Sequence, residues 1–253
     1  MASIPFVSVN IEGSKHLDLV KNFLAAAMPE VVCVQELFEA DVGVISEALD
    51  GAQAVFLPMN RRDDSQDDNA MIGVGIFSRL PIRAHRMLYY RGDPAVIHDY
   101  DNTSVETRYH SQNCGVLTCD IEKDGVAFRV ATTHFTWTPK GAADDFQRVD
   151  LKSMLEILET LDEFILCGDF NAPRVLAGVP GEIFGQLAAR YKDNIPTQYV
   201  TSLDPARHHA PLAEQADKMV DGLFTTPSYV ASNVELHTGV SDHCAITATI
   251  SCI

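Results

Sequence analysis

The sequence is short of basic residues and lacks the long apolar runs of a membrane protein. Its 253 residues include 19 Lys and Arg against 35 Asp and Glu, a formal net charge of −16. Binding to an extended stretch of duplex DNA needs basic side chains that neutralise many phosphates, so the negative net charge disfavours that mode of binding. No apolar run approaches the ~20 residues of a membrane helix, and the first residues show no basic segment followed by an apolar one. We therefore expect a cytoplasmic protein without a membrane anchor.

The six cysteines form neither a Cys-x-x-Cys pair nor another zinc-binding spacing. Cys33, Cys167 and Cys244 lie within apolar runs, where cysteine behaves as a small hydrophobic residue. A chain of this length can bury a stable core without disulfides. We expect reduced thiols in the core, as is typical of the cytoplasm.

The chain contains no internal repeat and no low-complexity linker, so we expect one domain spanning residues 1–253. Helical spacing of apolar residues predicts helices over 17–27, 39–50 and 146–161. Strands that partly alternate with helices and partly form hairpins predict mixed sheets covered by helices. The predicted strands are 4–9, 31–34, 54–57, 71–77, 116–121, 127–133, 164–167, 219–225, 229–236 and 244–250.

Polar residues stand at six places where a short apolar run stops. A buried carboxylate or amide costs free energy unless it is paired or binds a metal. Each such residue alone is most simply a cap or turn residue, and a lone histidine is most simply structural, but six together are hard to explain as independent caps. The residues are Asn10, Gln35-Glu36, His134, Gly168-Asp169-Phe170-Asn171, Asp221 and Ser241-Asp242-His243.

Oxygen-rich side chains of this kind suit a hard cation such as Mg²⁺ or Mn²⁺. A histidine beside them can supply acid–base catalysis or electrostatic stabilisation to a transferring phosphoryl group. The set therefore indicates a divalent-metal-dependent hydrolase of phosphate esters.

In this order, the motifs resemble those of the endonuclease/exonuclease/phosphatase superfamily, the pancreatic deoxyribonuclease-like fold. Gly-Asp-x-Asn at 168–171 and Ser-Asp-His at 241–243 are weak motifs alone, and their order with Asn10 and Gln35-Glu36 makes the match specific. The series spans residues 10 to 243. The resemblance implies an α/β (α+β) fold, a four-layer α/β/β/α sandwich of two packed mixed sheets flanked by helices, with the site at one edge.

The resemblance also implies a metal-binding set. Glu36 is expected to be the principal ligand of Mg²⁺ or Mn²⁺, with Asn10 and Asp242 as further ligands, directly or through water. Asp169 would orient or deprotonate the attacking water, and Asn171 would donate to a phosphoryl oxygen. Asp169 and Asn171 are also expected to contribute to metal binding.

Two histidines and an aspartate complete the expected catalytic group. His243 would contact the scissile phosphate and stabilise charge in the transition state. Asp221 would be its orienting partner, and His134 matches a second phosphate-contacting histidine. The implied chemistry is in-line attack of water on phosphorus without a covalent intermediate.

Departures from the family's patterns bear on its branches. Residues 10–13 read Asn-Ile-Glu-Gly where the abasic-site nucleases carry Asn-x-Asp-Gly or Asn-x-Asn-Gly, which leaves open whether Glu12 binds metal. This opening is loosely similar to that of the tyrosyl-DNA phosphodiesterase branch. Residues 219–222 and 172–174 lack the Cys-Asp-Arg and aromatic-Arg motifs of the inositol polyphosphate phosphatases, so that branch is disfavoured.

Substrate specificity is expected in loops. In the loop that follows His134, Trp137 offers an aromatic face and Lys140 a cation, although a loop anchor explains Trp137 equally well. Arg207 and His208 precede the Asp221 strand and are either substrate contacts or surface charge. Arg174 could also meet a phosphate.

Three hypotheses follow. The first is a phosphodiesterase that acts on nucleic-acid ends, single strands or a small phosphodiester. The second is a phosphomonoesterase for a sugar, lipid-headgroup or nucleotide phosphate. The third is a catalytically silent binding module, which the complete set of competent residues disfavours. No obligate protein partner is evident from the sequence.

Overall fold

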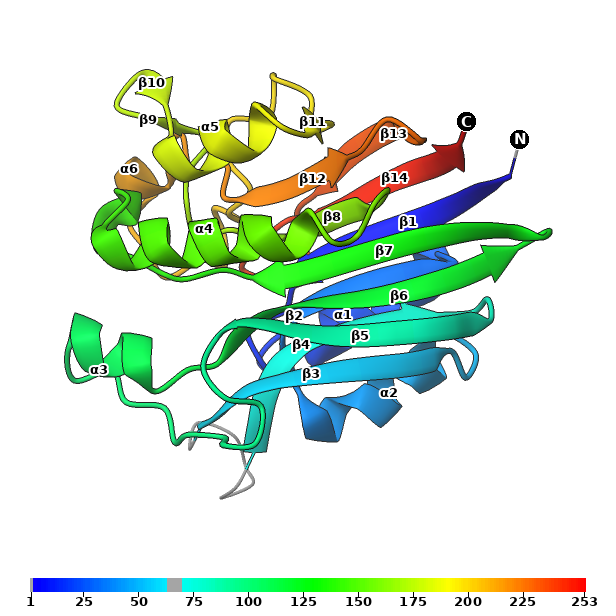
Figure 1. Cartoon of the computed structure of the whole chain (residues 1–253), viewed down its shortest axis with the longest axis horizontal. Helices are drawn as coiled ribbons and strands as arrows, with labels where there is room; N and C mark the ends of the chain where they lie inside the picture. The colour runs from blue at the N-terminus through cyan, green and yellow to red at the C-terminus, as the bar shows by residue number, and fades with distance from the viewer. Residues whose placement is uncertain (1, 63–69) are drawn as a thin grey trace.

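The computed structural model describes residues 2–62 and 70–253, with backbone alone for Lys140 and Ala213. Within these residues two six-stranded sheets pack face to face, and helices cover both outer faces (Figure 1). The predicted four-layer α/β/β/α sandwich of mixed sheets is therefore confirmed.

The first sheet has the strand order β13-β14-β1-β2-β4-β3. Only β1 and β2 pair in parallel, and the helix α1 (Leu17–Ala27) connects them. The strands are β1 (Ser3–Asn10), β2 (Val31–Phe38), β3 (Gln53–Arg62), β4 (Ala70–Ser78), β13 (Tyr229–His237) and β14 (Ala245–Cys252).

The second sheet has the order β11-β12-β8-β7-β6-β5. Here β7 and β8 are the parallel pair, connected through α4 (Asp145–Leu158). The strands are β5 (Ile82–Arg91), β6 (Cys114–Lys123), β7 (Val126–His134), β8 (Ile165–Asp169), β11 (Lys192–Asp193) and β12 (Asp221–Thr225).

Shorter elements complete the described chain. The helix α2 covers the first sheet beside α1, and α5 covers the second beside α4 (Figure 1). The shorter elements are η1 (Glu39–Asp41), α2 (Val42–Ala48), α3 (Val105–His110), η2 (Pro139–Gly141), β9 (Val175–Leu176), β10 (Val179–Pro180), α5 (Glu182–Ala188) and α6 (Leu212–Gln215).

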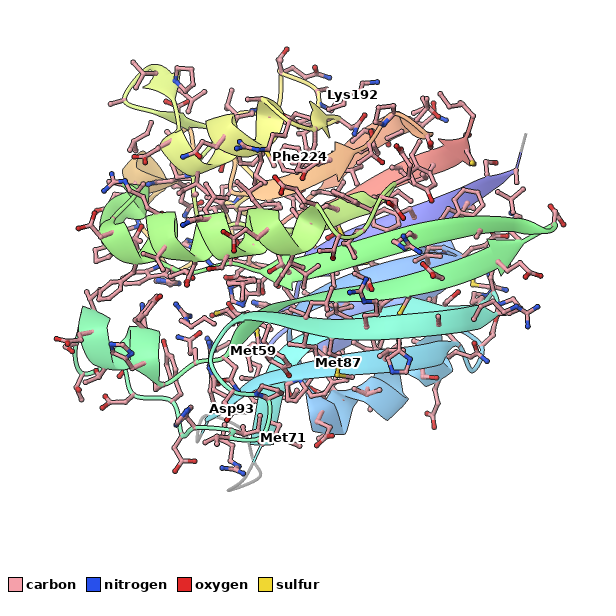
Figure 2. All side chains as sticks on the ribbon, viewed as in Figure 1. Met59, Met71, Met87, Asp93, Lys192 and Phe224 are labelled. Carbon is pink, nitrogen blue, oxygen red and sulfur yellow. The ribbon has the colours of Figure 1, made fainter. Side chains whose placement is uncertain are left out.

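The core has two layers because side chains along a strand alternate between the two faces of a sheet. On β1, Phe6 points into the core between the sheets, and Val7 packs with Val20 of α1. Under α5, Phe224 of β12 (labelled in Figure 2) lies 5.1 Å from Phe184, measured between ring centroids. All six cysteines lie in the described part of the chain and are free thiols, and five of them are buried.

All ten predicted strands and all three predicted helices are present, with shifted ends. The region 39–50 divides into η1 and α2, and the helix predicted to end at 161 ends at Leu158. The strand β5 was missed because residues 83–87 are exposed at a sheet edge and carry no apolar alternation. The helices α3, α5 and α6 were also missed, since they have four to seven residues.

The register of the parallel strands places the polar motifs together. Asn10 at the end of β1 pairs with Gln35 in β2. In the second sheet, Asp169 at the end of β8 pairs with His134 on one side and Asp221 on the other. The carboxyl ends of parallel strands are a common place for active sites in α/β proteins.

Candidate active site

Glu36 lies at an irregularity in β2, where the pairing with β4 shifts between Val34 and Leu37. Its φ of +53° is in the left-handed region, where a non-glycine residue costs of order 1–3 kcal/mol. Such bulges redirect a side chain out of the strand's alternation. The Glu36 carboxylate accepts hydrogen bonds from Asn10 Nδ2 at 3.2 Å and from an Arg62 guanidinium nitrogen at 3.3 Å.

Glu36 is ionised. Burial alone would raise the pKa of its carboxyl, but Arg62, His134 and Asn10 outweigh burial and lower this pKa to about 2. The carboxylate is thus available to a cation at any physiological pH.

Asn10 connects Glu36 to Asp169. Its Nδ2 also donates to Asp169 Oδ2 at 3.1 Å, and its Oδ1 accepts from the Glu12 backbone N–H at 3.1 Å. In this arrangement the amide holds two carboxylates in place, and its oxygen is used by the backbone.

Asp169 is buried at the end of β8. Its Oδ1 accepts from the Asn171 backbone N–H at 2.7 Å, and its Oδ2 lies 3.6 Å from His134 Nε2 and 3.9 Å from His243 Nε2. Burial and the neighbouring Asp221 raise the pKa of the Asp169 carboxyl, and the two histidines oppose the rise. A raised carboxyl pKa is a property of general bases in hydrolases.

Glycine is required just before Asp169. Gly168 has φ +142°, and a Cβ there would lie 2.0 Å from the Thr133 carbonyl oxygen. The absence of a side chain lets β7 and β8 approach closely where they carry His134 and Asp169.

His243 forms a pair with Asp221. The Nδ1–H donates to Asp221 Oδ2 at 2.7 Å, which leaves Nε2 directed toward Asp169. Burial would lower the pKa of the His243 imidazole, but Asp221, Asp169 and Asp242 raise it well above its ordinary value. His243 is therefore an imidazolium near neutral pH, held by a carboxylate as in catalytic histidine–aspartate pairs.

Asp242 and Glu12 face the same pocket as Glu36. The Asp242 carboxylate accepts from Ser241 Oγ at 3.1 Å. Burial raises its pKa, and the charges of Glu12 and Glu36 raise it further against the opposing effect of His243. Carboxylate oxygens such as these are the ligands that a hard divalent cation prefers.

Two neighbours of Glu12 were not predicted from the sequence. His16 Nε2 donates to Glu12 Oε2 at 3.1 Å, and the Lys15 ammonium binds Glu12 Oε1. One ligand atom each of Glu12, His16 and Asp242 lies within 4.8 Å of the others. The spacing of Glu12 and His16, four residues apart, was the available signal.

Asn171 and His208 also face the site. Asn171 has φ +51°, and its Nδ2 donates to the Phe135 carbonyl at 2.8 Å. His208 Nδ1 accepts from the Ala210 backbone N–H at 3.1 Å. Burial, followed by the charges of His243 and His209, lowers the pKa of His208 to about 4, so this imidazole is neutral.

Glu12, Glu36, Asp169, Asn171, His208, Asp242 and His243 line one pocket of about 310 Å³. The predicted Trp137 also lines it, together with cations and a tyrosine ring that the sequence did not indicate. The Arg62 guanidinium lies 4.7 Å from the Tyr100 ring centroid, and that of Arg108 lies 4.0 Å from the Trp137 ring centroid. Lys15 also lines this pocket. The pocket is thus acidic at its centre and cationic and aromatic along its wall.

Two predicted substrate contacts are not brought to this pocket. Arg174 donates to the carbonyls of Ile195 (2.9 Å) and Tyr199, and Arg207 donates to Asp204 at 3.3 Å. These arginines stabilise loops in the structure. The side chain of Lys140 lies outside the described residues.

The chain belongs to the endonuclease/exonuclease/phosphatase family, whose model matches residues 7–243. The resemblance predicted from the motifs is thereby confirmed. This family consists generally of hydrolases of phosphate esters, which typically use divalent metals. A search of curated proteins by sequence finds no match.

Solved structures share the fold. An endonuclease/exonuclease/phosphatase from Beutenbergia cavernae has a TM-score of 0.73 at 16% identity, over 100% of this chain and 72% of that one. The human Nocturnin catalytic domain with bound sulfate has a TM-score of 0.69 at 16% identity, over 99% of this chain and 94% of that one. D. rerio TDP2 complexed with single-strand DNA product has a TM-score of 0.67 at 14% identity, over 99% of this chain and 100% of that one.

Among the described residues, no helix has the length and the hydropathy that a membrane span requires.

Proposed function

We propose that this chain is a divalent-metal-dependent phosphodiesterase that acts as a single domain in the cytoplasm. One observation carries the proposal. An ionised Glu36 and an imidazolium, His243, flank the buried Asp169 carboxylate within one pocket. This combination provides a cation site, a base and a phosphate-binding charge side by side.

Glu36, Asp242 and Glu12 would hold Mg²⁺ or Mn²⁺. When bound, the ion supplies positive charge that neutralises the phosphate. The three carboxylates offer hard oxygen donors, and Asn10 holds Glu36 and Asp169 in a fixed relation. The Lys15 and Arg62 cations balance part of this charge before an ion binds.

Asp169 would orient and deprotonate the attacking water, because its raised pKa makes it a better base than an ordinary carboxylate. His243 Nε2–H would donate to a phosphate oxygen and stabilise the negative charge of the transition state. Asp221 fixes the tautomer of His243 through Nδ1. His134 and Asn171 would contact the remaining phosphate oxygens.

A diester is favoured over a monoester because the site continues into a second cavity, lined in part by His243 and Asn171. A phosphate at this junction has room for a group on each side. The cationic and aromatic wall of the site pocket also suits nucleic-acid ends or single strands, and TDP2, which shares the fold, was solved with a single-strand DNA product. A phosphomonoesterase for a small sugar, lipid-headgroup or nucleotide phosphate is the alternative.

The test is hydrolysis of short oligonucleotides, bis-p-nitrophenyl phosphate and nucleoside monophosphates with Mg²⁺, Mn²⁺ or a chelator. We expect metal-dependent cleavage of the diesters, and its loss in Asp169→Asn and His243→Ala with unchanged circular dichroism. Faster release of phosphate from the monoesters would favour the alternative. Full activity in both variants would exclude the site, and no activity on any substrate would favour a silent binding module.

A further inference from the structure

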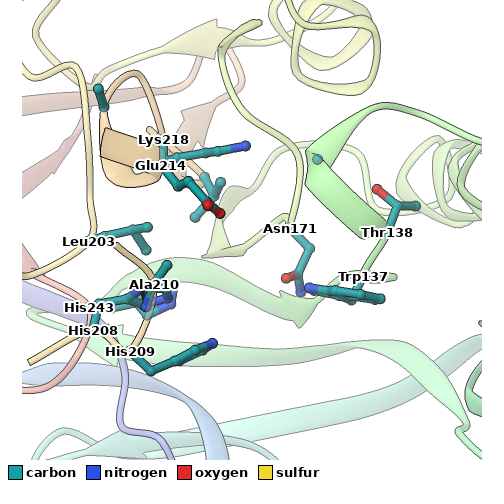
Figure 3. Close-up of a pocket in the computed structure, with 13 residues that line it drawn as sticks. Trp137, Thr138, Asn171, Leu203, His208, His209, Ala210, Glu214, Lys218 and His243 are labelled. Carbon is teal, nitrogen blue, oxygen red and sulfur yellow. Dashed lines mark hydrogen bonds between the residues drawn. The ribbon is translucent and has the colours of Figure 1, made fainter. Parts of the chain in front are cut away.

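A second cavity of about 600 Å³ adjoins the site pocket. The two cavities share Trp137, Asn171, His208, His209 and His243 in their walls. Figure 3 shows Trp137 and Asn171 on one side of the second cavity and the three histidines on the other. The scissile phosphate expected at His243 would therefore lie where the two cavities meet.

Trp137 forms an aromatic wall of the second cavity, and hydrogen bonds fix the loop residues on each side of it. Its side chain is 44% exposed although the residues on both sides of it are buried. The Thr136 carbonyl accepts from Gln147 Nε2 at 2.6 Å, and Thr138 Oγ1 donates to the Ala142 carbonyl at 2.9 Å. The loop is thus fixed on each side of an exposed indole, an arrangement that a simple packing anchor does not need.

The cation that covers the indole is on the side of the site pocket. Arg108 lies 4.0 Å from the ring centroid and lines the site pocket, but it does not line the second cavity. The part of the indole that faces the second cavity is therefore open to a flat ligand ring.

The opposite wall and the floor also suit an aromatic ring. The His208 and His209 rings are stacked, with centroids 4.5 Å apart. Leu203 and Val220 provide apolar surface, while Glu214 and Lys218 bring a carboxylate and an ammonium to the remaining side (Figure 3). Aromatic and apolar walls with a few polar groups are typical of pockets for heteroaromatic ligands.

We propose that this cavity binds a nucleobase, or a heteroaromatic ring of similar size, that belongs to one arm of the phosphodiester and stacks on Trp137. This inference rests on the proposed function because it places the phosphate at His243. It adds that the enzyme selects diesters by a ring on one side of the phosphorus.

Binding can be measured without turnover because Trp137 is the only tryptophan of the chain. Adenosine 5′-monophosphate and ribose 5-phosphate are titrated separately while indole fluorescence is excited above the tyrosine band, with N-acetyltryptophanamide as the control for light absorbed by the nucleotide. We expect saturable quenching by the nucleotide alone. Quenching by both ligands, or by neither, would overturn the proposed stacking.

Turnover is tested with two substrates. One is a dinucleotide, and the other is its abasic analogue, in which a tetrahydrofuran ring without a base replaces each nucleoside sugar. Stacking of one base is worth about tenfold to a hundredfold in binding, so the wild type should prefer the dinucleotide by about that factor in kcat/KM. Trp137→Ala should remove the preference through KM, and Trp137→Phe should retain most of it. Val149→Ala, which trims an exposed apolar side chain on α4, is the control.

The outcomes separate the two proposals. Equal cleavage of both diesters by the wild type, or an equal loss on both in Trp137→Ala, would overturn the ring site and leave the phosphodiesterase standing. Metal-dependent cleavage of neither diester would count against the phosphodiesterase, while the fluorescence titration would still decide whether the cavity binds a ring.

Discussion

The two halves of the active site differ in exposure and in how their charges are held. The cation half (Glu12, Glu36 and Asp242) includes Glu12 and Glu36, whose side chains are 21% and 18% exposed and pair with Lys15 and Arg62. The histidine half (His134, Asp169, Asp221 and His243) includes Asp169 and Asp221, which are only 3% and 4% exposed. Asp242 of the cation half is itself buried, so only Glu12 and Glu36 are partly exposed. Partly exposed carboxylates can exchange cations with solvent, whereas a buried network fixes where its protons lie. Substitutions in the first half should change metal dependence, and those in the second should change pH dependence.

The largest effect is expected from Glu36→Gln in the cation half. The amide keeps the size of the side chain but removes the charge that attracts the cation. Because a bound metal contributes several kcal/mol of charge stabilisation, turnover should fall by about 10³-fold, and half-saturation with Mg²⁺ should require a higher concentration. A metal titration of kcat/KM measures both. Glu39→Gln, the same exchange at an exposed residue of η1, should leave the titration unchanged; an equal change in both variants would contradict the assignment.

Gly168→Ala tests the close approach of β7 and β8, which places His134 and Asp169 of the histidine half side by side. The new Cβ would collide with the Thr133 carbonyl at a φ that alanine avoids. We expect the free energy of unfolding to fall by about 2–4 kcal/mol, measured by urea denaturation. Gly43→Ala is the matched control, since a Cβ at that position of α2 meets no atom within 4 Å. It should stabilise the protein by roughly 0.5–1 kcal/mol; a similar loss in both variants would argue against a specific clash.

Asp221→Asn should move the pH profile and leave the metal titration unchanged. The imidazolium of His243 is the form that donates to phosphate, so activity should be lost as pH rises through the pKa of His243. Asp221 raises that pKa; without its charge the pKa falls, and the alkaline loss should begin at a lower pH. Near neutral pH we expect a decrease of about 10- to 100-fold, the size known for residues that orient metal ligands, since Asp221 likewise orients His243 through Nδ1. A parallel drop at every pH would indicate damage to the fold instead.

The motif residues were predictable because each interrupts or borders an apolar run of the sequence. Asn10, His134 and Asp169 end their strands, whereas Asp221 begins β12 and His243 precedes β14. His134, Asp169 and Asp221 come from three strands that register places side by side. The family and the layers of the sandwich followed from the same ordered series.

The wall of the pocket was not predictable. Arg62 is the last residue of β3, where a charged run begins, and Tyr100 and Arg108 lie in the segment between β5 and β6. None of them is therefore marked by strand periodicity. Their positions depend on distant contacts, such as the stacking of Tyr109 on Phe146 at 4.1 Å between centroids, which holds α3 against α4. For the same reason Arg174 could not be told from a substrate contact by sequence alone, since the carbonyls that bind it belong to Ile195 and Tyr199. Arg207 binds Asp204, which is only three residues away in the same loop, and the sequence alone does not show that the two side chains meet.

The smallest effect is expected from Arg62→Met, which removes the cation that pairs with Glu36. Arg62 lowers the pKa of Glu36, and it occupies a carboxylate oxygen that a divalent cation would use. If it competes with the metal, its loss should lower the Mg²⁺ concentration for half-saturation by about 1.4- to fivefold, in keeping with about 0.2–1 kcal/mol for an ion pair that is partly exposed to solvent. Arg61→Met is the matched control, because Arg61 instead donates to the Ile97 carbonyl. A higher Mg²⁺ requirement in Arg62→Met would mean that Arg62 positions Glu36 for the cation, and the cation half would then be as preorganised as the histidine half.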